Sequence, residues 1–462
     1  MPFSRTRTGC YTCREEGYKC DEQKPFCGRC VRLDKTCKGY GVKLRWQTPE
    51  LPQSKEPRRR RQQRRLSPGS HGTSTVTPSA ASSPAVSPSP TSPMTQMALT
   101  PVAPVSIGSN MDPEHRYLLD HWTTTLGGVI SMATGTHQNP FLLHLTPMMA
   151  HSTSLRFALC SIAACHLAAL KNDQSLQTTA TRHRLRAVSS LRQSIQTDDP
   201  ELSLATVLML QLSDRLFTTD SGVDHLAGAN AIIKRGGANA WNSSSASFLL
   251  SLCCYHDILT SVSRGTRPIL ELKSQVPIEG AMSLQELTSV LQVVAQISRL
   301  QGQDHLDAQG RAIEQTLQTF DASIHSGGES GHTLQAYKHA SFIYLYRVWQ
   351  AGAPHPSAMN DHARSCLQHL SEVPVSSPLV SAHVWPLWTA GCETIGGEQR
   401  QLVGERIEAM WEARHLPSLR RIKQDMEEVW LIKDKQRNLI GEDNVDCIKA
   451  ILTHRRRAAD LA

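Results

Sequence analysis

The sequence has no uninterrupted apolar stretch of the roughly 18 residues that a membrane-spanning helix needs. Its first residues include basic side chains, but no apolar core follows them, so the pattern of a secretory signal peptide is missing as well. These two absences predict a protein with no membrane partner, in a reducing compartment where clustered thiols bind metal rather than form disulfides.

Signatures of catalysis are also missing. The chain has no nucleophile elbow, phosphate-binding loop, dinucleotide fingerprint or metalloprotease motif. Alternating strand patterns are almost absent, which argues against a sheet-based fold. The sequence therefore favours a helical protein that is not an enzyme. An enzyme site would need a pocket lined with converging titratable groups.

Positive charge is concentrated at one end of the chain. Residues 1–66 carry 18 Lys and Arg against 7 Asp and Glu, whereas the other residues carry 31 against 34. A strongly basic end on an otherwise near-neutral chain predicts contact with a polyanion, and nucleic acid is the leading candidate.

Composition divides the 462 residues into four segments. Residues 1–46 contain a cysteine cluster. Residues 47–66 contain a basic run that we interpret as a nuclear localisation signal, which the import machinery would bind. The alternative is that this run is only a solvated tail. Residues 67–111 hold no charged side chain and are rich in Pro, Ser and Thr, which predicts a disordered linker. Residues 112–462 predict an all-α domain. The basic run consists of Lys55, Arg58, Arg59, Arg60, Arg61, Arg64 and Arg65.

Apolar residues occur at helical spacing throughout the last segment. They are nearly continuous over helix length at residues 152–171 and 201–217, which predicts two buried helices. In a third predicted helix, Ser221 with Asp224 resembles a capping box, and Gly236 supplies the stop. Near the C-terminus the residues at helical spacing are Leu419, Ile422, Met426 and Val429.

Six cysteines form two half-repeats near the N-terminus. Each half has a Cys-x2-Cys pair, followed after six residues by a third cysteine. Three thiolates leave a zinc ion one ligand short of its preferred four, unless two sulfurs bridge two metals. Cys10 and Cys27 open the two halves and are the natural bridging pair. The sequence thus predicts two structural Zn²⁺ ions per chain, bound by Cys10, Cys13, Cys20, Cys27, Cys30 and Cys37.

This cluster resembles that of the fungal binuclear zinc-cluster (Zn2Cys6) transcription factors. The resemblance lies in TGCYTCREEGYKCDEQKPFCGRCVRLDKTCKGYGVKLRW, with Pro25 between the halves as in the family. It implies a small nuclear module with two short helices that binds double-stranded DNA, with the helix after the second cysteine in the major groove. Here that helix is expected over Arg14–Lys19. Family members form symmetrical dimers, so a homodimer is a further expected state of this chain.

One departure from the family pattern concerns base readout. Members usually carry a dense basic run after the second cysteine, and the two residues that read a CGG triplet correspond to Glu16 and Gly17 here. Neither can donate a side-chain hydrogen bond to guanine, so base readout is not carried over. The side chains expected to contact DNA, mainly its phosphates, are Arg14, Tyr18, Lys19, Arg29, Arg32 and Lys35, with Arg5 and Arg7 as additional phosphate contacts.

The helical segment resembles the fungal-specific regulatory domain that often accompanies this cluster, and most of all the acriflavine-sensitivity-control type. The similarity lies in DHLAGANAIIKRGG, YLYRVW, VWPLWTAGCE and the segment from RIEAMW to MEEVW. It implies a regulator of RNA polymerase II transcription in a fungal pathway, with a biosynthetic gene cluster as one candidate.

Other interpretations stay open at this stage. The cluster could dock a protein partner with little base-specific DNA readout, because its expected recognition helix is only weakly basic. Metal storage or redox chemistry is another alternative, although storage proteins do not usually carry a large helical domain. Cys165 with His166, and Cys253 and Cys254 with His256, are expected to pack in the core, because adjacent helix residues point about 100° apart and do not converge on one metal.

Overall fold

The computed structural model describes residues 9–23, 27–33, 35, 37, 111–133, 138–197, 199–217, 225–270, 285–303, 306–320, 328–350, 356–441, 445–455, 458 and 461. All regular secondary structure in these ranges is helical. Several predicted features lie outside them, namely the basic run at residues 55–65, residues 67–110 of the linker, the capping box at Ser221 and Asp224, and Arg5, Arg7 and Pro25.

The N-terminal module contains two short helices, α1 (Tyr11–Glu15) and α2 (Gly28–Arg32). Its buried centre consists of cysteine side chains rather than aliphatic ones. Five of the six cysteines are buried, and the sixth, Cys37, is half-buried. A module this small has too little apolar surface for an ordinary core, so metal ligation must supply its stability.

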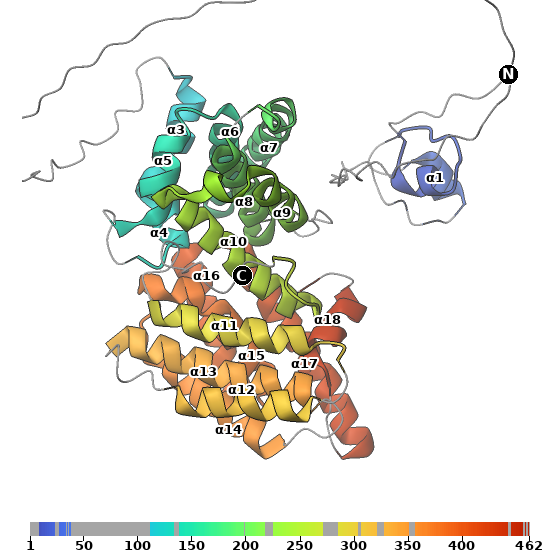
Figure 1. Cartoon of the computed structure of the whole chain (residues 1–462). Helices are drawn as coiled ribbons and strands as arrows, with labels where there is room; N and C mark the ends of the chain where they lie inside the picture. The colour runs from blue at the N-terminus through green and yellow to red at the C-terminus, as the bar shows by residue number, and fades with distance from the viewer. Residues whose placement is uncertain are drawn as a thin grey trace, which may run out of the picture. The chain divides into compact units, whose positions relative to one another are not determined.

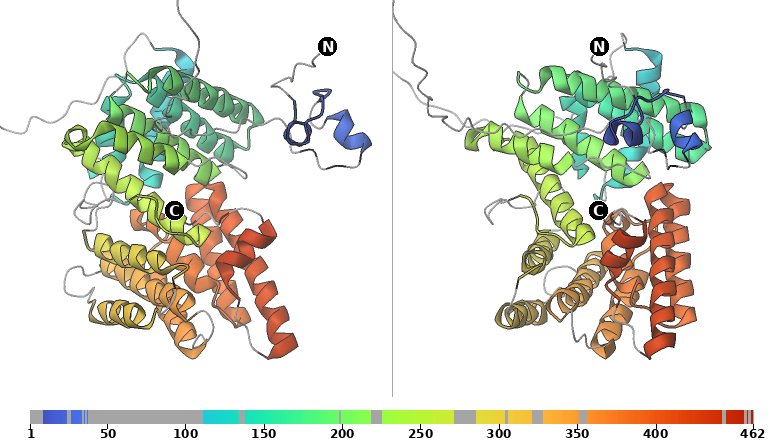
Figure 2. Two further views of the ribbon diagram at one scale, coloured as in Figure 1. Left: turned by 45° about the vertical axis from the view of Figure 1, so that its right-hand side comes forward. Right: turned by 90° about the vertical axis from the view of Figure 1, so that its right-hand side faces the viewer.

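The helical domain begins at α3 and contains two groups of helices, which Figures 1 and 2 show from three directions. The first group comprises α3 (Pro113–His121), η1 (Trp122–Leu126), α4 (Gly127–Ile130), η3 (Phe141–Leu145), α5 (Thr146–Met148), α6 (Thr153–Lys171), α7 (Gln174–Ser194), α8 (Pro200–Phe217), α9 (His225–Gly236), η4 (Ala238–Trp241) and α10 (Ser244–Arg264).

The second group comprises α11 (Gln285–Leu300), α12 (Asp307–Thr319), α13 (Gly328–Trp349), α14 (Pro356–Ser371), η5 (Pro378–Ala382), α15 (Val384–Gly391), α16 (Gly397–Arg414), α17 (Pro417–Ile440) and α18 (Cys447–Arg455). Helix α10 joins the groups, because it packs on α8 and α9 in the first and on α11 and α18 in the second. A second link is made where α17 packs on α8.

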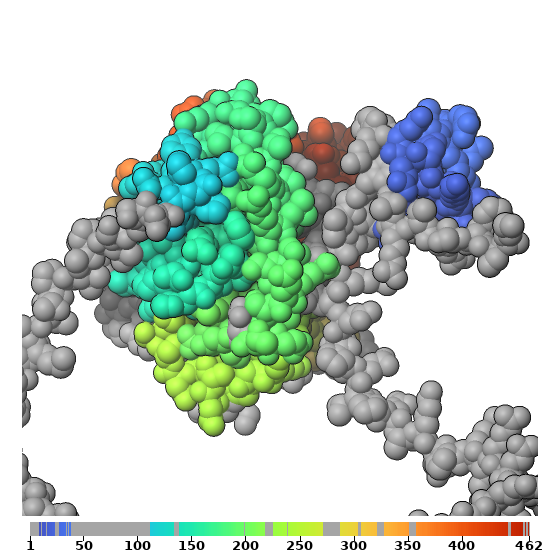
Figure 3. Space-filling model, turned by 90° about the horizontal axis from the view of Figure 1, so that it is seen from above, coloured from blue at the N-terminus to red at the C-terminus, as the bar shows by residue number. Residues whose placement is uncertain are grey.

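Helix α8 lies at the centre of the first group. Every residue from Ser203 to Phe217 is buried, so this helix is enclosed on all sides. Its neighbours are α6, α7, α9 and α10. The buried Asp214 of this helix is paired with Arg184 and His225. Figure 3 shows the outer surface of the first group, seen from above the view of Figure 1.

The predicted helices occur at the positions that the apolar patterns indicate. Helix α6 begins at Thr153, because the Ser152 hydroxyl oxygen accepts a hydrogen bond from the Leu155 amide at 3.2 Å. It ends at Lys171, because the following residue, Asn172, has a left-handed φ of 50°. The four residues at helical spacing near the C-terminus are all buried on α17. The all-α prediction is therefore confirmed for the described residues.

Two of the described helices, α6 and α10, are long and apolar enough to cross a membrane by composition alone. In this structure 67% of the apolar window of α6 and 78% of that of α10 are buried among other helices. Their hydrophobicity is accounted for by packing in the core of the domain.

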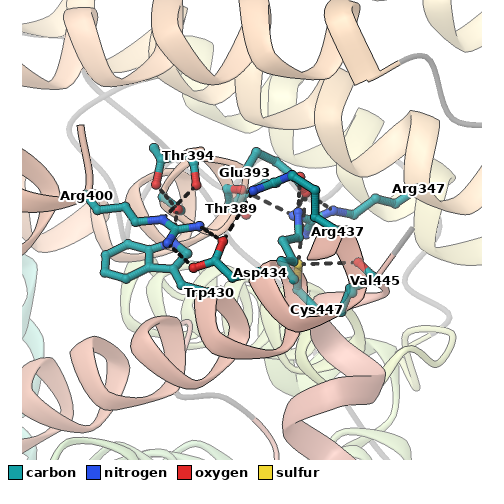
Figure 4. A network of polar contacts seen from close by, with 12 residues as sticks. Arg347, Thr389, Glu393, Thr394, Arg400, Trp430, Asp434, Arg437, Val445 and Cys447 are labelled. Atoms are coloured by element: carbon teal, nitrogen blue, oxygen red, sulfur yellow. Dashed lines mark hydrogen bonds and ion pairs between the residues drawn. The ribbon is translucent and has the colours of Figure 1, made fainter. Parts of the chain in front are cut away.

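A buried polar network joins four helices of the second group (Figure 4). The Glu393 carboxylate, just after α15, accepts a hydrogen bond from Arg347 Nε on α13 at 2.8 Å and pairs with Lys433 on α17. Burial alone would raise the pKa of Glu393, but the two cations outweigh it and lower that pKa to about 2. Beside this cluster, Arg400 on α16 binds both oxygens of Asp434 at 2.6 and 2.8 Å.

Candidate metal centre and nucleic-acid interface

The two sequence half-repeats fold in the same way. Cys10 caps α1 and accepts a hydrogen bond from the Cys13 amide at 3.4 Å, while Cys27 caps α2 and accepts one from the Cys30 amide at 3.3 Å. In each half the third cysteine returns to the first, with the Cys20 sulfur 3.3 Å from the Cys10 amide nitrogen. The corresponding distance in the second half, from Cys37 Sγ to Cys27 N, is 3.5 Å. The repeat in the sequence is therefore also a repeat in the structure.

The sulfur atoms form two overlapping groups of four. Within each group all Sγ atoms lie within 4.8 Å of one another, and the groups are Cys10, Cys13, Cys20 and Cys27, and Cys10, Cys27, Cys30 and Cys37. Cys10 and Cys27 belong to both, with their sulfurs 3.5 Å apart. Sulfur ligands about 2.3 Å from a tetrahedral zinc ion lie about 3.8 Å apart. The arrangement fits two zinc ions bridged by this pair, as the spacing predicts.

The protonation of these thiols depends on the metal. Burial raises the pKa of Cys10 and raises that of Cys27 to about 12, so without a cation both would be neutral at pH 7. Zinc binding must displace these protons, because only the thiolate is a ligand. All 13 cysteines are free thiols in the structure, consistent with metal ligation rather than disulfide formation in the cluster.

The recognition helix is shorter than predicted and lies earlier in the chain. The sequence predicts it over Arg14–Lys19, but α1 ends at Glu15. Gly17 has a φ of +76°, and the Tyr18 amide donates back to the Cys13 carbonyl at 2.9 Å, which is the hydrogen bond of a Schellman helix stop. Tyr18 and Lys19 therefore lie beyond the helix end, and Arg14 alone of the predicted contacts lies on α1.

Glu16 has a structural role that the sequence does not reveal. Its carboxylate lies 2.6 Å from Lys35 Nζ and 3.2 Å from Arg29 Nη1, so it ties the end of α1 to the second half of the module. Lys35 and then Arg29 lower the pKa of Glu16. Two predicted phosphate contacts are thus already paired with an acid.

Arg29 and Tyr18 also contact each other. The Arg29 guanidinium lies 4.0 Å from the centre of the Tyr18 ring, and its Nη1 lies 3.6 Å from Cys13 Sγ. Arg29 therefore offsets thiolate charge and braces the two halves. Arg14, Lys19 and Arg32 are exposed and remain the best-placed basic side chains for phosphate.

The other cysteine–histidine neighbours lie in the helical core, as expected. Cys165 contacts Ser213, and His166 Nε2 lies 3.0 Å from the Arg414 carbonyl oxygen. Cys253 is fully buried, and His256 lines an otherwise mostly apolar pocket between α8, α10 and α17. These contacts describe packing rather than a second thiolate cluster.

Comparison with known proteins identifies both folded parts. Residues 8–47 match the fungal Zn(2)-Cys(6) binuclear cluster domain, and residues 117–455 match the fungal-specific transcription factor domain. The cluster domain accounts for two zinc ions bound by the six cysteines. No solved structure matches the chain.

The curated relatives match over short stretches of this chain. The chain is 48% identical to arginine metabolism regulation protein II of Saccharomyces cerevisiae over 49 residues, which are 11% of this chain and 6% of that protein. It is 61% identical to white-opaque regulator 2 of Candida albicans over 36 residues, 8% of each chain. The match to sterol uptake control protein 2 of Candida albicans is 31% over 108 residues, 22% of this chain and 15% of that protein. The chain thus spans less than a fifth of the length of each of these relatives.

Proposed function

This chain belongs to the fungal-specific transcription factors that carry a Zn(2)-Cys(6) cluster, and we propose that it acts in the nucleus by binding double-stranded DNA through residues 1–46. The observation that carries this proposal is the pair of four-cysteine groups that share Cys10 and Cys27. The helical domain, residues 112–462, would regulate RNA polymerase II transcription of a fungal pathway. A biosynthetic gene cluster as target, a homodimer and the acriflavine-sensitivity-control type remain parts of this proposal.

The charge distribution supports DNA as the partner. Residues 1–66 hold 18 basic and 7 acidic side chains, and the described basic residues Arg14, Lys19 and Arg32 are exposed. Phosphate contacts of this kind supply affinity and orientation without reading sequence. Because neither Glu16 nor Gly17 can donate a side-chain hydrogen bond to guanine, we expect the module alone to have weak base preference. Arg29 and Lys35 are paired with Glu16.

Affinity of the full-length protein for duplex DNA should fall steeply as salt rises. Replacing Arg14 and Lys19 together with alanine should lower the slope of log K against log salt by about 0.9 for each phosphate that is no longer neutralised, about 1.8 in all. Fluorescence anisotropy across a salt series measures this slope. The matched control is Arg192→Ala with Lys234→Ala, two exposed basic residues on α7 and α9 that should leave the slope unchanged.

A second candidate function is docking of a protein partner. Val31 on α2 and the following Leu33 are 64% and 52% exposed, which gives the module an apolar surface. Apolar docking depends little on salt. Binding that does not respond to salt, or that the alanine pair leaves unchanged, would favour this candidate over DNA.

We also propose that the basic run at residues 55–65 is the nuclear localisation signal. Deleting these 11 residues should move a fluorescently tagged full-length protein from the nucleus toward the cytoplasm, because the import machinery would lose the basic run that it reads. The zinc cluster should stay folded, because the run contains none of the zinc ligands. Deletion of residues 80–90, equal in length but without charge, is the control. If nuclear accumulation survives the first deletion, the signal lies elsewhere in the chain.

A further inference from the structure

Three metal-ligating side chains far apart in the sequence meet in the first group of the helical domain. They are His115 on α3, Cys160 on α6 and His183 on α7, and their ligand atoms all lie within 4.8 Å of one another. Helix α3 packs against α6, and α6 against α7 (Figure 1). The three residues come from separate helices, so the tertiary fold and not a local motif brings them together.

His183 is held in the tautomer that a metal requires. Its Nε2 lies 2.7 Å from the Glu114 carboxylate, so Nε2 carries the proton and donates it. The ring is completely buried, and its Nδ1 has no hydrogen-bond partner. A buried lone pair without a partner is costly, and a bound cation would satisfy it. Histidines that bind zinc usually donate a hydrogen bond from the N–H of their other ring nitrogen, often to a carboxylate as here.

The protonation states favour ligation by neutral imidazole. Burial lowers the pKa of His183 despite the nearby Glu114 carboxylate, so the ring is neutral at pH 7. Burial also raises the pKa of the Cys160 thiol to about 12, and its proton would leave when a divalent cation binds. Charges of both signs lie near the site, with Asp112 and Glu114 acidic and Arg156 and Arg182 basic.

We propose that Cys160 Sγ, His183 Nδ1 and a ring nitrogen of His115 bind one Zn²⁺ ion, separate from the two ions of the cysteine cluster. One thiolate with two imidazoles suits zinc and excludes the oxygen-preferring Mg²⁺ and Ca²⁺. Tetrahedral ligand atoms lie about 3.3–3.8 Å apart, so ligand atoms that all lie within 4.8 Å of one another need to approach by about 1.5 Å at most. His115 is half-buried, whereas Cys160 and His183 are buried, so the His115 ring is the ligand that would move when the ion binds. The ion would link α3, the first helix of the domain, to α6 and α7.

Zinc content of the full-length protein tests the proposal. After equilibration with a small excess of Zn²⁺ and desalting, elemental analysis should find one ion per chain more than the cysteine cluster holds. Cys160→Ser and His115→Gln should each lose that ion. The matched control is Cys165→Ser, a buried cysteine on the same helix whose sulfur contacts Ser213, and this variant should keep it.

Cobalt absorption and the zinc content of a cluster variant test the same site independently. With Co²⁺ in place of Zn²⁺, Cys160→Ser should remove part of the thiolate-to-cobalt absorption, whereas Cys165→Ser should not. Cys20→Ala should lower the cluster's zinc and leave the additional ion in place, which separates this site from the cluster. Equal zinc in the wild type and Cys160→Ser, or equal loss in Cys165→Ser, would overturn the proposal. Should Cys160→Ser fail to fold by circular dichroism, His115→Gln decides, and retention of the ion there refutes the site.

Discussion

Replacing Cys20 or Cys37 with alanine will release zinc and unfold residues 10–37, while the helical domain keeps its structure. Each of these cysteines belongs to one of the two four-sulfur groups only, so each substitution leaves one zinc ion with three sulfur ligands. Because cysteine side chains rather than aliphatic ones form the buried centre of the module's described residues, its folding free energy is largely its metal-binding free energy, about 10–16 kcal/mol for structural zinc in small modules. We therefore expect loss of the whole module rather than local damage.

Zinc content and amide chemical shifts of residues 10–37 measure this outcome. Cys254→Ser is the control, because Cys254 is a half-buried cysteine on α10 with no place in the cluster. DNA binding should disappear together with the zinc. A module that stays folded with one zinc ion, or with none, would show that side-chain packing holds it and would contradict this account.

The zinc ligands are predictable because their geometry is encoded locally. A Cys-x2-Cys pair places both sulfurs at one helix start, and the repetition of the same spacing in the second half forces two sulfurs to be shared. The same reasoning identifies α6 and α8, where apolar side chains run almost without interruption over helix length. In both cases the information lies within about 30 residues of sequence.

The recognition helix differs from the predicted one because a single glycine sets its end. From the sequence, Gly17 indicates only that a side chain able to contact a base is missing at this position. In the structure, its left-handed φ ends α1 before Tyr18. Glu16 likewise indicates only a residue that cannot read guanine. Its partners, Arg29 and Lys35, lie 13 and 19 residues further along the chain, and no spacing rule connects them.

Interactions between distant helices are not predictable from this sequence. His115, Cys160 and His183 have no shared motif, and they meet because α3, α6 and α7 pack together. Glu393 follows the VWPLWTAGC stretch as an ordinary acidic residue, and nothing in its neighbourhood predicts cations 46 residues before it and 40 after it. Such sites depend on tertiary packing that a single sequence does not reveal.

Substituting Glu393→Gln will destabilise the helical domain by about 3–5 kcal/mol, the usual consequence of leaving buried charges without their partner. The side chains of Arg347 and Lys433 are only 12% and 4% exposed, so water cannot replace the missing carboxylate. Glutamine keeps the shape of glutamate, but only one of its two terminal atoms can accept a hydrogen bond, so one of the two cations loses its acceptor together with the negative charge. The pKa of Glu393 is lowered to about 2, so its contribution is complete above the ordinary glutamate pKa of about 4.3 and is lost as pH falls toward 2.

Urea unfolding of the full-length protein followed at pH 7 and at pH 3 measures this effect. The matched control is Asp434→Asn, which removes the acid of the neighbouring pair with Arg400, where the carboxylate is 39% exposed and the expected loss is about 1 kcal/mol or less. The difference between wild type and Glu393→Gln should shrink at pH 3, because the glutamate of the unfolded chain, with its ordinary pKa of about 4.3, is protonated there while the folded one is still mostly ionised. If Glu393→Gln costs no more than Asp434→Asn at pH 7, water or rearranged side chains compensate the two cations, and the network in Figure 4 does not hold α13, α15 and α17 together in the way its geometry indicates.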